Sequence, residues 1–203
     1  PKVIDHSGNG HHGTVHGAKW KMDDKMGGIY VFNGKSSYIQ LPKSLLESLT
    51  QLKAGSVVIR LRPAKKDMQH IVTAGSSSSP NFWLGLRLSQ HNRPEILQRN
   101  GDEFDKVAVN TSIPVQDWLT LQYQSDGAQY TALIDNQDTN VRVLHGRNSG
   151  DWYGGTHNLD LLCIGCMKRE SSASGFFAGE IAEVAFYNVS IDSSGEPAPR
   201  PMK

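Results

Sequence analysis

The sequence predicts an all-β fold: a two-sheet antiparallel jelly-roll sandwich with at most one short helix. Short apolar or alternating stretches recur along the 203 residues, and clusters of Gly, Asn, Asp, Ser and Pro separate them. This spacing is typical of sandwiches and jelly rolls. The strand candidates are residues 14–22, 28–32, 37–41, 56–62, 69–74, 81–88, 95–99, 106–109, 118–125, 129–135, 142–144, 158–165 and 179–189.

The last strand candidate is apolar on both faces, so we expect it to lie inside a sheet. Strict alternation puts Ala182, Val184 and Phe186 on one face and Ile181 with Glu183 on the other. If Glu183 is buried, its carboxylate needs a partner.

Two local patterns complete the expected architecture. Residues 44–52 have apolar side chains at a helical period and a possible cap at Ser44, which predicts the one short helix. The Asn33-Gly34 pair predicts a tight β-hairpin between the strands at 28–32 and 37–41.

Composition restricts the organisation and the partners. The length suits one large β domain over residues 1–192, and the Pro-rich stretch 193–203 is expected to be a linker or tail, so the parent protein should continue. A formal net charge of +1 gives no reason to expect a nucleic-acid partner. The sequence has no run of 18 apolar residues, so we expect no membrane span.

The two cysteines, Cys163 and Cys166, form a C-x-x-C pattern inside the strand predicted at 158–165 and just beyond it. In a strand, positions three apart point to opposite faces, which would prevent a disulfide or a shared metal ion. We therefore expect two separate, apolar thiols.

Several stretches resemble, in family order, the laminin-G-like modules of the concanavalin A-like lectin/glucanase superfamily. They cover about residues 4–191. They are DHSGNGHHGTVHGA at 5–18, GIYVFNGKSSYIQLP at 28–42, WLTLQYQSDG at 118–127, LCIG at 162–165 and FAGEIAEVAFY at 177–187. The resemblance implies a two-sheet jelly roll in an extracellular or periplasmic protein, secreted or displayed at the cell surface.

Three departures from the family pattern bear on structure. The family usually has a full strand before the loop at 5–13, whereas here only Pro1–Ile4 precede it. That strand is either cut away or supplied by another segment of the parent. Without it, the strand at 179–189 would have an unpaired flank. Ala182 and Ala185 stand where the family often has Asp and Arg.

An enzyme of the glycoside hydrolase type is the alternative function. Glucanases of this fold place carboxylates at i and i+2 on one strand, where they face one cleft. Glu180 and Glu183 are three apart and so should project from opposite faces, and Ala182 occupies the place of a middle carboxylate. We therefore assign no catalytic residues.

A structural calcium ion is a second hypothesis. Calcium prefers carboxylates and backbone carbonyls held by a turn, and the glycine-rich loop at 5–13 offers Asp5 and Asn9, with Glu183 as a further candidate ligand. The alternative is that Asp5 and Asn9 form Asx turns with their own backbone.

Carbohydrate binding is the third hypothesis. The loop at 150–155 holds Trp152 and Tyr153 between glycines, flanked by Asn148 and Asp151, so the aromatic rings could stack on a sugar while the polar groups bind its hydroxyls. The alternative is that the loop folds back and Trp152 fills one end of the sandwich. The other tryptophans, at positions 20, 83 and 118, lie in strand patterns and are expected in the core.

Basic residues offer a further possibility. Arg60 and Arg62 share a strand face, and Arg87, Arg93 and Arg99 follow later. They could bind an acidic glycan through bidentate contacts, or simply form a solvated sheet face.

Together these patterns favour a non-catalytic recognition module of a larger, exported protein. We expect it to bind carbohydrate, or a protein partner, through loops or a sheet face. A purely structural spacer domain is the remaining alternative.

Overall fold

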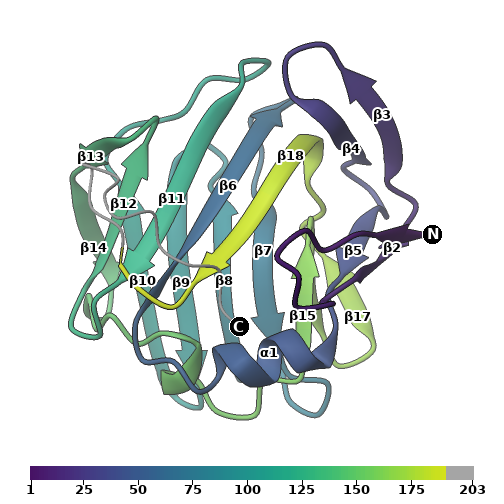
Figure 1. The fold of residues 1–203 in the computed structure, drawn as a ribbon. Coiled ribbons are helices and arrows are strands. Elements are labelled where there is room, and N and C mark those ends of the chain that lie inside the picture. The colour runs from purple at the N-terminus through teal and green to yellow at the C-terminus, as the bar shows by residue number, and fades with distance from the viewer. Residues whose placement is uncertain (191–203) are drawn as a thin grey trace.

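The structure, a computed structural model, describes residues 1–190, which form two large antiparallel sheets packed face to face (Figure 1). In spatial order, the nine-stranded sheet contains β1 (Lys2–Val3), β2 (Gly13–His16), β5 (Tyr38–Gln40), β15 (Leu161–Ile164), β7 (Gln69–Gly75), β8 (Phe82–Leu88), β9 (Pro94–Asn100), β10 (Glu103–Val109) and β14 (Val141–His145). The seven-stranded sheet contains β13 (Gln137–Thr139), β12 (Tyr130–Ile134), β11 (Leu119–Ser125), β6 (Gly55–Pro63), β18 (Ala178–Tyr187), β4 (Gly27–Asn33) and β3 (Lys19–Asp23).

Three smaller elements lie outside these sheets. The hairpin of β16 (Met167–Arg169) and β17 (Ser172–Ser174) forms a two-stranded sheet of its own. The helix α1 (Lys43–Leu49) and the short 3₁₀ helix η1 (Tyr153–Gly155) lie in connections. The all-β sandwich with one short helix is confirmed for the described part of the chain, and the predicted tail at 193–203 lies outside it.

The core between the sheets follows from alternation along the strands. On β6, Val57, Ile59 and Leu61 are completely buried, while the residues between them face outward. On the opposite sheet, Leu84 and Leu86 of β8 are each 1 % exposed and belong to the same core. Burial of these two apolar faces against each other is the main stabilising contribution to the fold.

Two connections differ from those that the sequence predicted, one at Gly17 and one at Asn33. The stretch at 14–22 is two strands, because Gly17 adopts a φ of 68° and the chain passes from β2 in one sheet to β3 in the other. The hairpin predicted at Asn33-Gly34 is wrong, since β4 and β5 belong to different sheets. The Asn33 Oδ1 accepts hydrogen bonds from the N–H groups of Lys35, Ser36 and Ser37, which shapes this crossing.

The predicted helix is confirmed, but its cap is not. Leu45, Leu46 and Leu49 of α1 are buried, as the period requires. The helix starts at Lys43, one residue before Ser44, and Pro42 occupies the N-cap position without a side-chain cap.

The strand β18 lies inside its sheet, as predicted, between β6 and β4. Its register with β6 shifts between Ile181 and Glu183, so Ala182 is the extra residue of a β-bulge. Beyond the bulge, Val184 pairs with Ile59 just as Ile181 pairs with Leu61, so both face the core. The strict alternation assumed from the sequence is therefore wrong, and Glu180 and Glu183 share the outer face.

The expectation of two separate thiols is also wrong. The strand β15 ends at Ile164, and Gly165 adopts a φ of 87°, which brings the buried Cys166 back beside Cys163. The two reduced thiols share a hydrogen bond, and this bond together with burial raises the pKa of Cys166.

Gly165 is the tightest of these turns, and its substitution should be costly. A Cβ at this position would lie 2.6 Å from two ring carbons of Phe32, at a positive φ that disfavours L side chains. We expect Gly165→Ala to lower the free energy of unfolding in urea by about 3 kcal/mol. Gly101→Ala is the matched control because Gly101 has a φ of 70° with nothing within 4 Å, and it should cost only about 1 kcal/mol. Equal losses in the two variants would contradict the clash.

Candidate functional site

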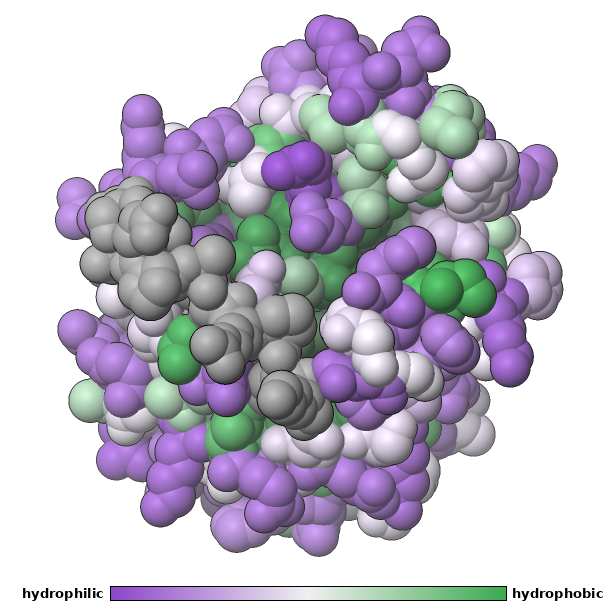
Figure 2. All heavy atoms as spheres, viewed as in Figure 1, coloured by the Kyte–Doolittle hydropathy of each residue, from purple (hydrophilic) through white to green (hydrophobic). Residues whose placement is uncertain are grey.

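A cleft of about 840 Å³ opens along β18, between the N-terminal segment and the β3–β4 pair. The strand β4 pairs with β18 only from Ala178 to Ile181. Beyond that point β18 continues beside β6 to Tyr187, and no strand of the described chain pairs with its other flank. Figure 1 shows the two strands diverging, and Figure 2 shows a hollow in the same place. Within the described residues, this flank of β18 is therefore unpaired.

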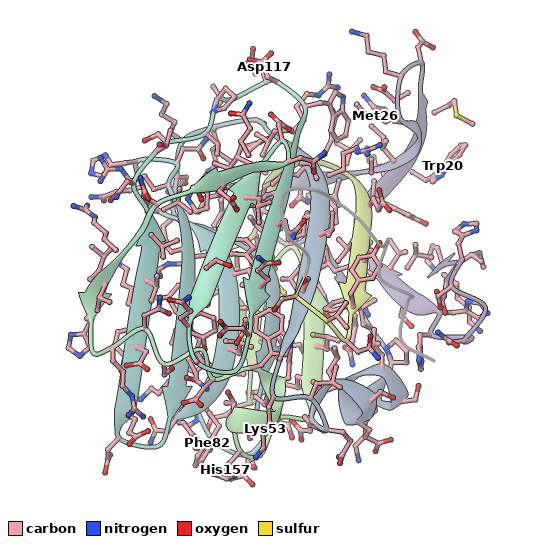
Figure 3. All side chains as sticks on the ribbon, turned by 60° about the vertical axis from the view of Figure 1, so that its left-hand side comes forward. Trp20, Met26, Lys53, Phe82, Asp117 and His157 are labelled. Carbon is pink, nitrogen blue, oxygen red and sulfur yellow. The ribbon has the colours of Figure 1, made fainter. Side chains whose placement is uncertain are left out.

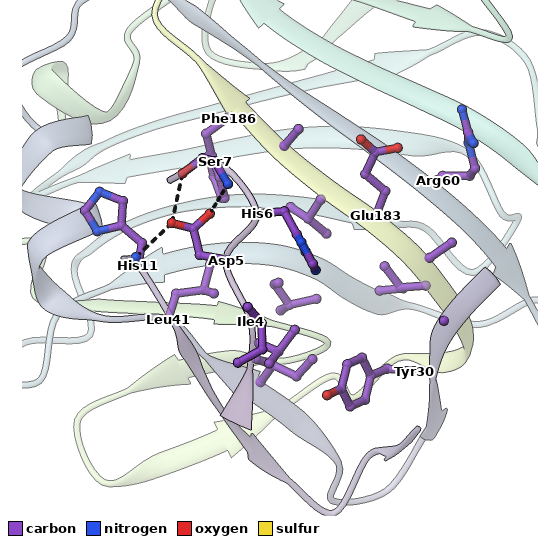
Figure 4. A pocket seen from close by; sticks show the side chains of 18 of the residues that line it. Ile4, Asp5, His6, Ser7, His11, Tyr30, Leu41, Arg60, Glu183 and Phe186 are labelled. Atoms are coloured by element: carbon purple, nitrogen blue, oxygen red, sulfur yellow. Dashed lines mark hydrogen bonds between the residues drawn. The ribbon is translucent and has the colours of Figure 1, made fainter. Parts of the chain in front are cut away.

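The bottom of the cleft is apolar and its rim is polar. Core residues such as Phe32, Ile39 and Ile164 line the bottom. Figure 4 shows Ile4, Asp5 and His6 of the N-terminal segment on one side, with Glu183 and Arg60 on the other.

The N-terminal loop is held together by Asp5. One carboxylate oxygen accepts a hydrogen bond from the N–H of Ser7, and the other accepts from the Ser7 hydroxyl and the N–H of His11, all at 2.8 Å (Figure 4). Burial acts to raise the pKa of Asp5, but these hydrogen bonds outweigh it and hold the pKa below its usual value. This is the Asx-turn arrangement that the sequence left as the alternative to a calcium site.

The three candidate calcium ligands do not form a donor set. Asp5 points toward Ser7 and His11, whereas Glu183 lies beside Arg60 across the cleft (Figure 4). Over residues 1–190, no group of three or more His, Cys, Asp or Glu side chains could hold a metal ion. Asn9 lies in the same loop as Asp5 and lines the cleft. The calcium ion stays a prediction without support from this geometry.

The two glutamates of β18 have different environments. Glu180 forms ion pairs with Arg62 and, at 2.6 Å, with Lys21, and its side chain is 13 % exposed. Glu183 is exposed and faces Arg60 across the pair of strands, and neither side chain forms a hydrogen bond or ion pair within residues 1–190. Glu183 is thus not the buried tether that the sequence suggested.

The loop with Trp152 and Tyr153 folds back into the sandwich. Both side chains are 1 % exposed and belong to the core, with ring centroids 5.2 Å apart. Asn148 accepts a hydrogen bond from the Tyr130 N–H at 2.7 Å and donates one to its carbonyl, and the Tyr130 hydroxyl donates to the Asp151 carbonyl. Rings buried in this way offer no face to a sugar, so the structure favours the alternative in which Trp152 fills one end.

Truncation of Trp152 should therefore affect stability. We expect Trp152→Ala to lower the free energy of unfolding by about 3–5 kcal/mol, because a large cavity would form in the core. The matched control is Trp20→Ala, since Trp20 is 58 % exposed, and its cost should stay below about 1 kcal/mol. Urea unfolding followed by circular dichroism measures both, and a Trp152→Ala protein as stable as the parent would contradict a core role.

The tryptophans predicted to be in the core have three different surroundings. Trp83 is buried and Trp118 is half-buried beneath the Arg62 guanidinium, at 5.0 Å. Trp20, on the edge strand β3, is exposed and lines the cleft, and Figure 3 shows its ring at the margin of the molecule. The prediction was wrong for Trp20, because a strand pattern does not reveal that the strand lies at a sheet edge beyond the reach of the facing sheet.

A second polar surface lies on the outer face of the nine-stranded sheet. The register places Arg87 of β8 opposite Glu95 of β9. Glu95 is 3 % exposed, and its two oxygens bind the Arg87 Nε at 2.8 Å and the Lys106 Nζ at 3.1 Å. We call Arg87, Glu95 and Lys106 the charged face. With two cations and one carboxylate, the charged face has a net positive charge. The ion pairs with Glu95 also hold both cations in place.

Aromatic rings lie next to the charged face. Trp83, Phe104 and His145 follow one another with centroid separations of 6.0 and 5.2 Å. Lys106 pairs with His145 across β10 and β14, so the last ring stands beside a cation. Planar rings beside fixed donors are the combination found in small-molecule binding sites. Arg87 was among the sequence candidates, whereas Glu95 and Lys106 were missed because their contact depends on the register of three strands.

His70 lies on β7, directly opposite Arg87 of β8, and so borders the charged face. It is 7 % exposed, and its Nδ1 has no hydrogen-bond partner within the described chain. Burial, together with the positive charges of Arg87 and Arg169, lowers the pKa of His70 to about 3.

The neutral His70 ring should make stability depend on pH. Its pKa in the unfolded chain is about 6.5, so below that pH only the unfolded state takes up the proton, and stability falls as the pH drops toward about 3. We expect His70→Gln to remove about 2 kcal/mol of the loss in unfolding free energy between about pH 6.5 and about pH 5. His6→Gln, at an exposed loop position, should leave that loss unchanged. An unaltered pH profile in His70→Gln would refute the buried neutral ring.

Comparison with solved structures finds similar folds at low sequence identity. Domain 4 of AbnA, a GH43 extracellular arabinanase from Geobacillus stearothermophilus in complex with arabinotriose, has a TM-score of 0.73 at 19 % identity, over 95 % of this chain and 89 % of that one. The CBM40 of the Ruminococcus gnavus IT-sialidase, bound to α2,3-sialyllactose, has a TM-score of 0.64 at 14 % identity, over 73 % and 83 %. NanB sialidase from Streptococcus pneumoniae has a TM-score of 0.66 at 17 % identity, over 87 % and 28 %.

These similarities establish the β-sandwich fold. The chain matches no protein-family model and no curated protein sequence. The narrower resemblance to laminin-G-like modules stays a prediction. Within residues 1–190, no helix has the length and apolar character needed to span a membrane.

Proposed function

We propose that this domain is a non-catalytic carbohydrate-binding module that recognises a carboxylate-bearing glycan at the charged face. The observation that carries the proposal is the pair of cations, Arg87 and Lys106, held on the buried Glu95 beside the half-buried Phe104 ring and the exposed His145 ring. A guanidinium fixed through its Nε still has N–H groups for a second acceptor, and it matches a carboxylate in geometry.

Similar structures support the carbohydrate class of ligand. The CBM40 is bound to sialyllactose, a sugar with a carboxylate, and the AbnA domain is in complex with the neutral arabinotriose. The fold alone is therefore compatible with acidic and neutral glycans. The net positive charge of the charged face is what favours the acidic class here.

The cleft is a weaker candidate for the glycan. Its bottom consists of side chains from the hydrophobic core, such as Phe32 and Ile164. Sugar hydroxyls placed there would lose water without gaining hydrogen bonds, which costs free energy for each group. The charged face lets a glycan keep its hydroxyls in solvent while its carboxylate binds the cations.

The carboxylates near the cleft give little support to a glycosidase. The bulge places Glu180 and Glu183 on one face, but Glu180 is occupied by Arg62 and Lys21. The lowered pKa of Asp5 makes it a poor general acid. Within the described residues, neither Glu180 nor Asp5 is therefore suited to share the chemistry of hydrolysis with Glu183. This supports a binding role over catalysis, and a spacer domain would not need the charged face.

The partners and compartment follow from the same proposal. A glycan ligand outside the cell and further domains in the parent protein fit a secreted or cell-surface module. The similar AbnA domain belongs to an extracellular arabinanase.

Binding of matched sugars tests the charged face. By isothermal titration we expect 3′-sialyllactose and a trigalacturonate to bind more tightly than lactose and arabinotriose, and the affinity should fall as salt is added. Arg87→Gln should weaken the acidic sugars about ten- to one-hundredfold, because a charge-assisted hydrogen bond is lost.

The control is Arg60→Gln, which removes an exposed arginine from the cleft and should leave these affinities unchanged. Binding that is equal for acidic and neutral sugars would refute the choice of ligand class. If Arg60→Gln loses binding while Arg87→Gln keeps it, the glycan binds in the cleft and not at the charged face.

A further inference from the structure

The cleft has a backbone edge as one of its walls. Within the described chain, the five residues 183–187 of β18 pair with β6, the bulge residue Ala182 pairs with neither neighbour, and no strand pairs with the other flank from 182 to 187. In a β-strand the N–H and C=O groups of alternate residues point to either side, so this flank presents unpaired backbone donors and acceptors to the cleft. Buried or half-buried backbone groups of this kind require partners.

The other walls are apolar and belong to both sheets. Phe32 and Ile181 come from the seven-stranded sheet, and Ile39 and Ile164 come from the nine-stranded sheet. The core of the sandwich is therefore open to solvent along this flank. An occupant has to supply apolar groups toward the core and backbone hydrogen bonds toward β18.

Exposed apolar side chains surround the mouth of the cleft. Ile4 and Trp20 line it and are 55 % and 58 % exposed, and Met22, beside Trp20 on β3, is 65 % exposed. Large apolar residues gathered around an open core mark a surface that binds a partner. On the outer face, Arg60 and Glu183 are exposed and have no ion pairs within residues 1–190.

The geometry points to a strand acceptor: the cleft binds one extended peptide segment that adds a strand to the seven-stranded sheet beside Ala182–Tyr187. The segment continues the ladder that β4 forms with β18 up to Ile181. It is about six residues and about 20 Å long. Its inward side chains are apolar, and its outward side chains carry charges that pair with Arg60 and Glu183. Such strand addition combines backbone affinity with side-chain specificity.

The shape of the cleft distinguishes this occupant from a second copy of the domain. The flank lies between the N-terminal segment, with Val3 and Ile4, and the β3–β4 pair, with Trp20 and Tyr30. A strand that pairs with β18 would lie about 4.8 Å from it, between these two walls. A single extended segment brings only its own width into the cleft, whereas a second copy would bring the rest of its sheet past the exposed Ile4 and Trp20.

Selection from random peptides tests the strand acceptor. A phage-displayed library of linear decapeptides is selected on the immobilised domain, and enriched peptides are synthesised. We expect enriched sequences with apolar residues at alternate positions. In hydrogen–deuterium exchange, the synthetic peptide should slow the exchange of amides in residues 182–187 while leaving the exchange at β14 unchanged.

Two valine variants separate the cleft from the rest of the surface. Val184 faces the core side of the cleft, and Val184→Thr keeps its shape while adding a hydroxyl, so peptide affinity should fall about tenfold. Val143→Thr, on β14 and 47 % exposed, is the matched control and should bind like the parent.

Five results would overturn the inference. The library could give no enrichment, the enriched peptides could lack alternation, or Val184→Thr could bind them as tightly as the parent. The amides of residues 182–187 could also be protected by 3′-sialyllactose, or by self-association of the domain, which light scattering would detect. If Val184→Thr binds sialyllactose as tightly as the parent, the glycan site is independent of the strand acceptor, and each proposal can be tested without the other.

Discussion

The β-bulge at Ala182 is the local constraint on which this part of the structure depends. One extra residue lets Ile181, Val184 and Phe186 all face the core, although their spacing in the sequence forbids this in a regular strand. It also places Glu180 and Glu183 on the outer face, opposite Arg62 and Arg60. Pairing with β4 stops immediately before the bulge, and the cleft begins there.

The cleft and the charged face place opposite demands on a ligand. In the cleft, core side chains meet an unpaired backbone edge, so an apolar peptide in extended conformation suits it. On the charged face, Glu95 is buried and so loses its hydration, and its carboxylate holds Arg87 and Lys106 in fixed positions. That arrangement is useful where an anion must be bound without reorganising long side chains. A module with both surfaces could bind a glycan and stay attached to a neighbouring segment at once.

Trp152 and Trp20 show why the sequence did not reveal which tryptophan is buried and which is exposed. Both are large aromatic residues close to glycines, and burial depends on what lies across from them. Trp152 follows Gly150, whose φ of 66° lets the loop turn back over Tyr130. Trp20 sits on β3, the last strand of its sheet, where the facing sheet does not cover it. A nearby glycine permits a turn, but the burial of each ring depends on segments that lie far from it in the sequence.

The sequence by itself determined the class of fold, most strand positions, the buried face of α1 and the central place of β18, because apolar periodicity and turn residues act locally. Only the tertiary structure decided which sheet each strand joined, where the bulge fell, that Asp5 binds its own loop, and that Arg87, Glu95 and Lys106 meet. Those outcomes depend on contacts between segments far apart in the chain, where register and packing outweigh local preference.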